Sequence, residues 1–296
     1  MDKDDYWVKQ QQFTKTVYRD VYPAIDPTSA SNSQAGKVVV ITGASRGLGR
    51  LAFVKSFAKA SPKAMVLVAR ALGPLEEVRD EIHAINKDIE VLAVPTDLLS
   101  AESIASLWEK VKEKFGHADV LINNAGSLNG GTIADAEVDK WWSDFETNVK
   151  GVFLLTQGFL RLLGKERKGS IVALSTSAAF MAFPGMSCYS ISKLASTQLQ
   201  AFVAAENPNV TAISVHPGIV LTDMTLDAFR PYAKDTPELV GGLGVWLSTE
   251  KAEFLNGRYI EANWSVDDLV ARKEEIVGKG KLSVKLEAEL GYEQFE

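Results

Sequence analysis

The sequence predicts a single α/β domain built on a doubly wound parallel β-sheet with helices on both faces. Three observations favour this fold class. Short apolar runs rich in β-branched residues alternate with segments of helical periodicity from residue 37 onward. The first apolar run leads into a glycine-rich turn and then a helix. Residues 169–222 contain only two charged side chains, Lys193 and Glu206, as expected of elements buried at the centre of a sheet.

Each predicted strand is a continuous apolar run, which is typical of parallel strands buried on both faces. The runs are residues 38–42, 64–69, 90–94, 119–122, 170–174, 210–215 and 258–261. Between them, apolar residues recur at helical spacing. The helices are predicted at residues 47–60, 74–86, 101–115, 138–163, 188–205 and 237–247. Because strand and helix alternate throughout, the sheet is expected to be parallel.

Composition divides the chain into a central domain and two flanking segments. The predicted boundaries are residues 1–36 for an N-terminal extension, 37–265 for the domain and 266–296 for a charged C-terminal tail. Phe13, Val17 and Val21 recur every four residues, which predicts a short amphipathic segment that docks on the domain. The tail is expected to wrap the surface or to stay mobile.

The overall composition excludes several classes of protein. The 296 residues include 32 basic and 38 acidic side chains, for a net charge of −6, with 46% apolar and 24% charged residues. Such values are ordinary for a globular protein, and the acidic balance argues against a nucleic-acid partner. No secretory signal, uninterrupted apolar span or metal-ligand cluster is apparent, and Cys188, the single cysteine, cannot form an internal disulfide. These features favour a cytoplasmic protein without a membrane partner.

The turn after the first predicted strand has the pattern of a phosphate-binding loop. It reads Thr42-Gly43-Ala44-Ser45-Arg46-Gly47-Leu48-Gly49. Glycines allow the backbone to turn sharply and to approach a pyrophosphate, whose charge then lies at the N-terminus of the following helix. The spacing is TGxxxGxG.

Three further motifs follow in order along the chain. Asn123-Asn124-Ala125-Gly126 comes after the fourth predicted strand, Tyr189-Ser190-Ile191-Ser192-Lys193 matches YxxxK, and Pro217-Gly218 ends the sixth strand. Together with the glycine turn, these motifs resemble those of the short-chain dehydrogenase/reductase family and cover residues 37–265. The resemblance implies a Rossmann-type fold with a nicotinamide cofactor at the carboxyl ends of the strands.

Tyr189 and Lys193 are the strongest candidates for catalysis. They lie four residues apart on a predicted helix, so their side chains share a face. A nearby ammonium favours a phenolate, so Lys193 is expected to lower the pKa of Tyr189 from its usual value of about 10. The resemblance implies that Tyr189 is the general acid/base, that Lys193 also bonds the nicotinamide ribose, and that Asn148 holds a water for proton relay.

A second hydroxyl is needed to hold the carbonyl oxygen of a substrate. Family members usually carry a serine thirteen residues before the tyrosine, and here position 189 − 13 = 176 is Thr176. Threonine keeps the hydroxyl, and its methyl group narrows the site. Ser175 and Ser177 flank Thr176 and remain alternatives.

The end of the second predicted strand indicates which cofactor is preferred. NAD-binding enzymes place an acidic residue there to bond the ribose 2′-hydroxyl, whereas this chain has Arg70. Arg70 and Arg46 suit a 2′-phosphate, so NADP(H) is expected in preference to NAD(H). The resemblance implies an adenine-binding role for Asp97. The full set of expected cofactor-binding residues is Gly43, Ser45, Arg46, Gly47, Leu48, Gly49, Arg70, Asp97, Leu98, Asn124, Ala125, Gly126, Tyr189, Lys193, Pro217, Gly218, Val220 and Thr222.

The expected activity is NADP(H)-dependent interconversion of a carbonyl (ketone or aldehyde) and an alcohol by hydride transfer. The catalytic residues are then Asn148, Thr176, Tyr189 and Lys193. The alternatives are a non-redox use of the fold, as a dehydratase, isomerase or cyclase, and a sensor that only binds NADP(H).

The resemblance also bears on substrate and assembly. Residues 1–36 and 257–264 are similar to those of fungal oxidoreductases, some from secondary metabolism, so a natural-product carbonyl is one expected substrate. Family members usually pair their two long helices, here residues 138–163 and 188–205, so a homodimer or homotetramer is expected. Family members carry a mobile substrate lid at the position of Met224, Leu226, Phe229 and Tyr232; these side chains contact the substrate or serve only to pack.

Overall fold

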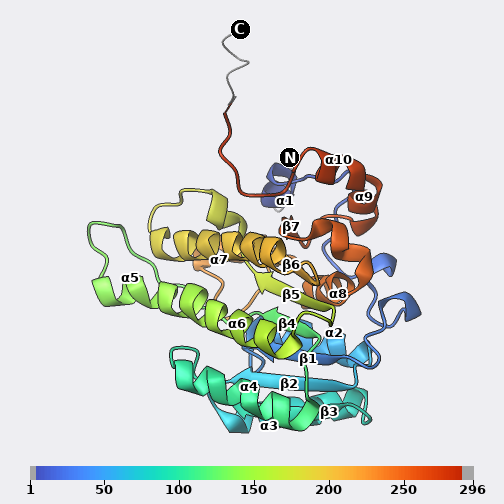
Figure 1. The fold of residues 1–296 in the computed structure, drawn as a ribbon. Coiled ribbons are helices and arrows are strands. Elements are labelled where there is room, and N and C mark those ends of the chain that lie inside the picture. The colour runs from blue at the N-terminus through green and yellow to red at the C-terminus, as the bar shows by residue number, and fades with distance from the viewer. Residues whose placement is uncertain (1–4, 289–296) are drawn as a thin grey trace.

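The computed structural model describes residues 5–288, which form one seven-stranded parallel sheet (Figure 1). The strands are β1 Val38–Thr42, β2 Ala64–Ala69, β3 Glu90–Pro95, β4 Val120–Asn123, β5 Gly169–Leu174, β6 Val210–His216 and β7 Tyr259–Glu261. Their order is β3-β2-β1-β4-β5-β6-β7, so the winding reverses between β1 and β4. Doubly wound sheets bind ligands at the carboxyl ends of the strands beside this reversal. The predicted fold class is confirmed.

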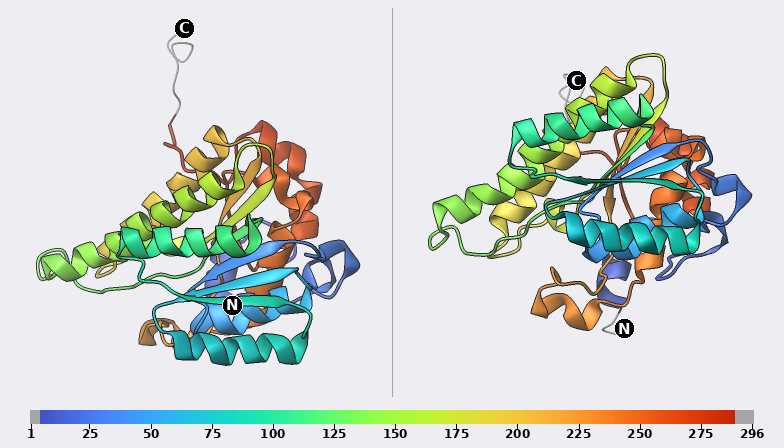
Figure 2. Two further views of the ribbon diagram at one scale, coloured as in Figure 1. Left: turned by 60° about the horizontal axis from the view of Figure 1, so that its bottom comes forward. Right: turned by 90° about the horizontal axis from the view of Figure 1, so that it is seen from below.

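Helices cover both faces of the sheet (Figure 2). On one face lie η4 Gly49–Val54, α2 Lys55–Lys59, α3 Leu72–Ile85 and α8 Pro237–Leu247. On the other lie α4 Ala101–Phe115, α5 Val138–Phe145, η5 Glu146–Gly151, α6 Val152–Leu163 and α7 Ser187–Glu206. Shorter elements are α1 Tyr6–Gln10, η2 Pro23–Ile25, η3 Ala30–Asn32, η6 Ser177–Phe180, η7 Asp227–Tyr232, η8 Glu250–Leu255, α9 Val266–Ala271 and α10 Lys273–Gly278.

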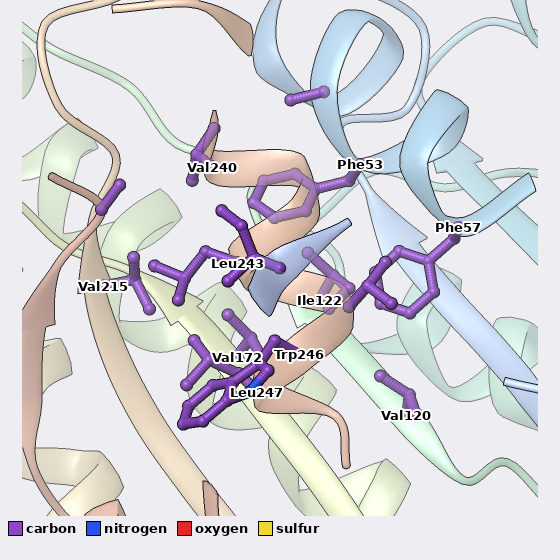
Figure 3. Packing of buried hydrophobic residues seen from close by; sticks show 14 of the residues in the cluster. Phe53, Phe57, Val120, Ile122, Val172, Val215, Val240, Leu243, Trp246 and Leu247 are labelled. Carbon is purple, nitrogen blue, oxygen red and sulfur yellow. The ribbon is translucent and has the colours of Figure 1, made fainter. Parts of the chain in front are cut away.

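The core on the first face is packed by aromatic and branched side chains (Figure 3). Phe53 and Phe57 come from the helix after β1 and pack near Leu243 and Trp246 of α8. These side chains lie over Ile122 of β4, and all five are buried. Burying one such side chain contributes roughly 1.5–3 kcal/mol. This packing fixes the helix that begins after the glycine turn, and with it the position of the turn.

The predicted elements of the domain are confirmed, with strand ends that differ by no more than one residue and helix ends by no more than two. The long helix expected at residues 138–163 is one continuous helical run composed of α5, η5 and α6. Its middle section, η5, has π-helical hydrogen bonding and carries Asn148. Widening of a helix in this way is frequent at functional sites.

The amphipathic segment at residues 13–21 docks on the domain as expected, but it is not helical. The extension holds the short helix α1 and the 3₁₀ turns η2 and η3, and η2 packs on α8 and α9. Backbone hydrogen bonds to distant groups replace helical ones, because Thr16 N donates to Asp268 Oδ2 (2.7 Å) and Tyr18 N donates to Asn263 O (2.8 Å). Phe13 packs against the main core, as its apolar character suggested.

The expected charged tail begins with two helices that pack on the domain. Val266 and Leu269 of α9 and Ile276 of α10 are buried in the main core. Residues 279–288 follow without helix or strand, and residues 289–296 of the predicted tail lie outside the described residues. Within residues 5–288, no helix is long and apolar enough to span a bilayer, and no cluster of side chains is suited to hold a metal ion.

Candidate active site

The glycine turn after β1 forms a tight backbone cradle. Gly43 and Gly47 have φ values of +66° and +54°, which side chains other than glycine rarely adopt. A Cβ on Gly49 would lie 2.0 Å from the carbonyl oxygen of Gly43, so the turn and the helix start can approach only without it. The backbone N–H groups at this helix start suit the pyrophosphate of a dinucleotide.

The segment after β4 is braced directly to β1. Thr42 Oγ1 accepts hydrogen bonds from the backbone N–H groups of Asn124 (3.0 Å) and Ala125 (3.1 Å). Asn124 Nδ2 in turn donates to Thr42 O at 2.7 Å. The side chain of Asn124 therefore holds the segment after β4 against the end of β1. Thr42 is the first residue of the TGxxxGxG motif, but it was not among the expected site residues.

Gly126, Asn148, Tyr189 and Lys193 converge beside this segment. A Cβ on Gly126 would lie 3.0 Å from Asn148 Oδ1 and 3.2 Å from Lys193 Nζ, so the close approach of these groups to the backbone favours glycine here. Lys193 Nζ lies 5.9 Å from the centre of the Tyr189 ring and donates to Leu174 O at 2.8 Å. α7 places both side chains on one face, as the four-residue spacing predicted.

The surroundings of Tyr189 and Lys193 favour their neutral forms. Burial raises the pKa of Tyr189 to about 12, and although interaction with the Thr176 hydroxyl lowers it, the charge of Asp144 adds to the rise. Burial lowers the pKa of Lys193 to about 8, against the raising effect of Asp144. The expectation that the pKa of Tyr189 is lowered is therefore wrong, because loss of hydration outweighs the effect of nearby groups. The raised pKa favours the neutral phenol of Tyr189.

The three candidate hydroxyls after β5 have different surroundings. Ser175 is buried and its Oγ lies 2.7 Å from Thr197 Oγ1 of α7, so it is engaged away from Tyr189. Thr176 caps the N-terminus of η6, where its hydroxyl accepts a hydrogen bond from Ala178 N at 3.2 Å, and it also acts on the phenol of Tyr189. Ser177 is half-buried in the first turn of η6. Of the three, Thr176 is the one whose hydroxyl interacts with Tyr189.

Cations lie at the carboxyl ends of β1 and β2. Arg46 in the glycine turn is exposed and makes one long contact, 3.7 Å, with the exposed Asp223. Arg70 follows β2 directly, is exposed, and pairs with no acidic side chain within the part of the chain described. Asp97 is exposed and accepts from Leu99 N at 3.0 Å, while Leu98 is half-buried. The two guanidinium groups remain accessible to an anion.

A buried carboxylate supports the loop after β6. Asp235 Oδ2 accepts from Ile219 N at 2.6 Å, and Oδ1 accepts from Arg19 at 3.1 Å and Asn263 at 2.8 Å. Gly218 has φ +79°, and a Cβ there would lie 2.5 Å from Asp235 Oδ2. Asp235 was missed by sequence reasoning, because its partners are distant in the chain and it belongs to no motif. This loop holds the expected cofactor-binding residues Pro217, Val220 and Thr222. Within it, Thr222 N donates to Thr225 Oγ1 at 2.9 Å.

The N-terminal extension packs against the expected lid. Trp7 of α1 contacts the rings of Phe183, Phe229 and Tyr232 at centroid distances of 5.8, 6.1 and 6.3 Å. Phe229 and Tyr232 belong to η7, and Figure 2 shows α1 beside the orange segment that holds this element. Two of the four lid residues thus pack on the extension, whereas Met224 and Leu226 are exposed.

Comparison with known proteins identifies the class. The family model described as short chain dehydrogenase matches residues 37–232. The chain is 36% identical over 280 residues to the short chain dehydrogenase mpl6 of Monascus purpureus, covering 91% of this chain and 94% of that protein. It is 34% identical over 287 residues to the short chain dehydrogenase andI of Emericella variicolor, covering 93% and 97%. The chain therefore belongs to the short-chain dehydrogenase/reductase family, and is an oxidoreductase.

Solved structures share the fold. An oxidoreductase of Escherichia coli, yciK, superposes with a TM-score of 0.72 at 25% identity, covering 79% of this chain and 98% of that one. A short chain dehydrogenase of Shigella flexneri, crystallised as a complex with NADP, gives a TM-score of 0.71 at 25% identity, covering 78% and 99%. Members of the family bind a nicotinamide cofactor, and the tight glycine cradle at Gly43 and Gly49 fits such a ligand.

Proposed function

We propose that this chain is an NADP(H)-dependent oxidoreductase that interconverts a carbonyl group and an alcohol. The observation that carries the proposal is the convergence of Tyr189, Lys193 and Asn148 around Gly126, at the carboxyl end of β4 and beside the glycine cradle. When bound, the nicotinamide supplies or accepts a hydride at its C4 atom. Side chains of this site would hold the substrate oxygen, transfer the proton and bind the cofactor.

In the reducing direction, Tyr189 Oη gives its proton to the substrate oxygen as the carbonyl carbon gains the hydride. The neutral phenol that burial maintains is the form needed for this step. The Thr176 hydroxyl holds the same oxygen and stabilises its developing charge. Oxidation runs these transfers in reverse, with Tyr189 accepting the proton.

Lys193 and Asn148 support the proton transfer and the cofactor. Lys193 Nζ, fixed by its hydrogen bond to Leu174 O, would bond the ribose of the cofactor and would stabilise the phenolate of Tyr189 after its proton has left. Asn148 Nδ2 donates to Ser127 O (2.9 Å) and Ser192 Oγ (3.0 Å), so its side chain is rigidly held where a proton relay would pass. The substrate oxygen, Tyr189 and this relay form the proposed route to solvent.

Arg46 and Arg70 support the preference for NADP(H). Their exposed guanidinium groups lie after β1 and β2, where the adenosine ribose of a dinucleotide binds in this fold, and no acidic residue follows β2. A 2′-phosphate would form charge-assisted hydrogen bonds with them. The Shigella flexneri structure complexed with NADP lends further support.

The test is a spectrophotometric assay of the purified protein with NADPH or NADH and a panel of ketones and aldehydes. The proposal expects NADPH oxidation with at least one carbonyl, and tighter binding of NADPH than of NADH. Arg70→Ala should weaken NADPH binding about tenfold and leave NADH binding unchanged. Binding of NADPH without turnover of any carbonyl would favour a sensor or a non-redox enzyme instead.

The substrate class is also proposed from relatives. The chain resembles fungal short chain dehydrogenases. This similarity, together with the resemblance of residues 1–36 and 257–264 to fungal oxidoreductases, favours a natural-product carbonyl of secondary metabolism as the substrate. The panel should therefore include aromatic aldehydes and β-dicarbonyl compounds alongside simple ketones.

The proposed assembly is a homo-oligomer built on α5, η5, α6 and α7. A shallow groove of about 600 Å³ runs between these helices and is lined mainly by Trp142, Phe145, Val149, Phe153, Leu199 and Phe202. Trp142 and Phe202 expose 55% and 56% of their surface. Apolar patches of this kind mark association surfaces, and a second copy would cover the same helices.

A further inference from the structure

Asp144 is a fully buried acid that the proposed mechanism does not use. It lies on α5, one turn before Asn148 on the same helical run, and 0% of its surface is exposed. Within residues 5–288 it forms no ion pair, and no motif marks it in the sequence. A buried carboxylate is costly unless several donors satisfy it, so its partners indicate its purpose.

The carboxylate binds the segment that follows the Asn-Asn-Ala-Gly motif. Asp144 Oδ1 accepts from Ser127 Oγ at 2.7 Å and from Asn129 Nδ2 at 2.8 Å, and Oδ2 accepts from Asn129 N at 3.0 Å. Three donors from two residues hold this segment against α5. α7 holds it from the other side, because Cys188 Sγ donates to Asn129 O at 3.0 Å.

The same segment fixes Asn148. Ser127 N donates to Asn148 Oδ1 at 3.0 Å, and Asn148 Nδ2 donates back to Ser127 O at 2.9 Å. Asn148 thus depends on Ser127, and Ser127 depends on Asp144. Removing the carboxylate would release one member of this chain of contacts and, with it, the orientation of the Asn148 amide.

Asp144 also supplies the negative charge of this region. Lys193 is 4% exposed and forms no ion pair within the described residues. Asp144 from α5 is the acid whose charge acts on both Tyr189 and Lys193, and Cys188 lies beside it at the start of α7. Tyr189 in turn acts on the buried Tyr259 of β7. All three hydrogen bonds of the Asp144 carboxyl group are accepted from N–H or O–H donors.

We propose that Asp144 is a positioning residue that holds residues 127–129 against Asn148 and places a fixed negative charge behind Tyr189 and Lys193. That charge favours the protonated form of both side chains, and so favours the phenol as proton donor. Consistent with this, Asp144 acts to raise the pKa of Tyr189, of Lys193 and, after burial, of the Cys188 thiol. The effect on catalysis rests on the proposed function, whereas the negative charge of Asp144 does not depend on it.

The variants separate charge from placement. Asp144→Asn removes the charge and keeps the size, although one of the three hydrogen bonds is lost because an amide nitrogen cannot accept. Asp144→Glu keeps the negative charge but moves the carboxylate farther from the helix backbone by one methylene group. Asp139→Asn is the matched control, because Asp139 lies in the first turn of the same helix and is exposed. If Asp144→Asn does not fold, the smaller neutral variant Asp144→Ser takes its place.

The first measurement needs neither cofactor nor substrate. Cys188 is the single cysteine, so the ultraviolet absorbance of its thiolate against pH, with Cys188→Ser as the blank, reports the charge beside it. The neutral variant should ionise the thiol at a pH lower by about half a unit or more, whereas Asp139→Asn should match wild type. Identical titrations of wild type and the neutral variant would overturn the proposed charge.

The second measurement is the pH profile of carbonyl reduction and alcohol oxidation. In the neutral variant both limbs should move to lower pH, because Tyr189 and Lys193 each lose a proton more readily. Asp144→Glu should keep the limbs in place and lower kcat. Unmoved limbs with a uniformly lower kcat would show a structural role alone and contradict the proposal. A wild type without turnover would instead overturn the proposed function, and the thiol titration would then decide the inference.

Discussion

Glu261 keeps a carboxyl group in the interior at the carboxyl end of β7. It is 5% exposed, and Tyr259 donates its hydroxyl to Glu261 Oε1 at 3.1 Å. Burial raises the pKa of Glu261 to about 8, and Asp235 adds to the rise. The folded protein therefore holds a proton on this group at pH values where the unfolded chain has released it.

This raised pKa predicts a loss of stability with rising pH. The contribution of Glu261 is fully present below its ordinary pKa of 4.5 and is lost as pH rises toward 8. Between pH 5 and pH 8, wild type should lose about 3 kcal/mol of unfolding free energy relative to Glu261→Gln. Urea denaturation of both proteins at the two pH values measures the difference; parallel changes would contradict the buried neutral carboxyl. His216, whose pKa burial lowers to about 4, affects both proteins equally.

Among the individual residues of the site, the sequence predicted those that belong to short local patterns. The spacing of Tyr189 and Lys193 placed them on one helical face, which α7 confirms. Asp144 and Asp235 could not be predicted, because each is defined by partners many residues away. The direction of the pKa shift of Tyr189 was also beyond the sequence, since it depends on how much water the folded site excludes.

Among the elements, the N-terminal extension is the least regular and the most closely connected to the lid. Trp7 packs on Phe183, Phe229 and Tyr232, and Arg19 pairs with Asp235 at 3.1 Å. Strand and helix periodicity predicted the regular elements of residues 37–265 because apolar runs form the strands and apolar residues recur on the buried faces of the helices. The four-residue spacing of apolar side chains in residues 13–21 does not correspond to a helix. Tertiary hydrogen bonds satisfy the backbone of that segment instead.

Removing the Trp7 ring should loosen the lid. Trp7→Ala loses contacts with three rings, and because Trp7 is only half-buried the expected cost is about 1–2 kcal/mol of local stability. Amide hydrogen exchange in residues 217–236 should rise about tenfold. Tyr6→Ala, which removes an exposed ring from the same short helix, is the control. Equal exchange in all three proteins would show that the extension does not restrain η7.

For the whole molecule, the groove on α5, η5, α6 and α7 predicts self-association. Residues 169–222 include β5, α7 and β6, so their lack of charge is explained by burial in the sheet and, on α7, by the proposed contact between copies. Phe202 and Ile191 of α7 are exposed apolar side chains on this surface or beside it. A charged side chain in such a contact would be desolvated without a partner.

Phe202→Asp should convert the oligomer to a monomer without unfolding it. Light scattering coupled to size-exclusion chromatography measures the mass, and thermal unfolding verifies the fold. Val277→Asp, a similar change on the exposed face of α10, should leave the mass unchanged. A wild type that is monomeric at micromolar concentration would contradict the proposed assembly.

Replacing Tyr189 with phenylalanine tests whether Tyr189 transfers the proton in an NADPH-dependent carbonyl reduction. The measurement is the rate of NADPH oxidation with a carbonyl that wild type reduces, together with the dissociation constant of NADPH. We expect Tyr189→Phe to lower kcat about a thousandfold and to leave NADPH binding within about threefold of wild type, because only the hydroxyl is lost. A Tyr189→Phe protein that reduces the carbonyl at the wild-type rate would contradict it.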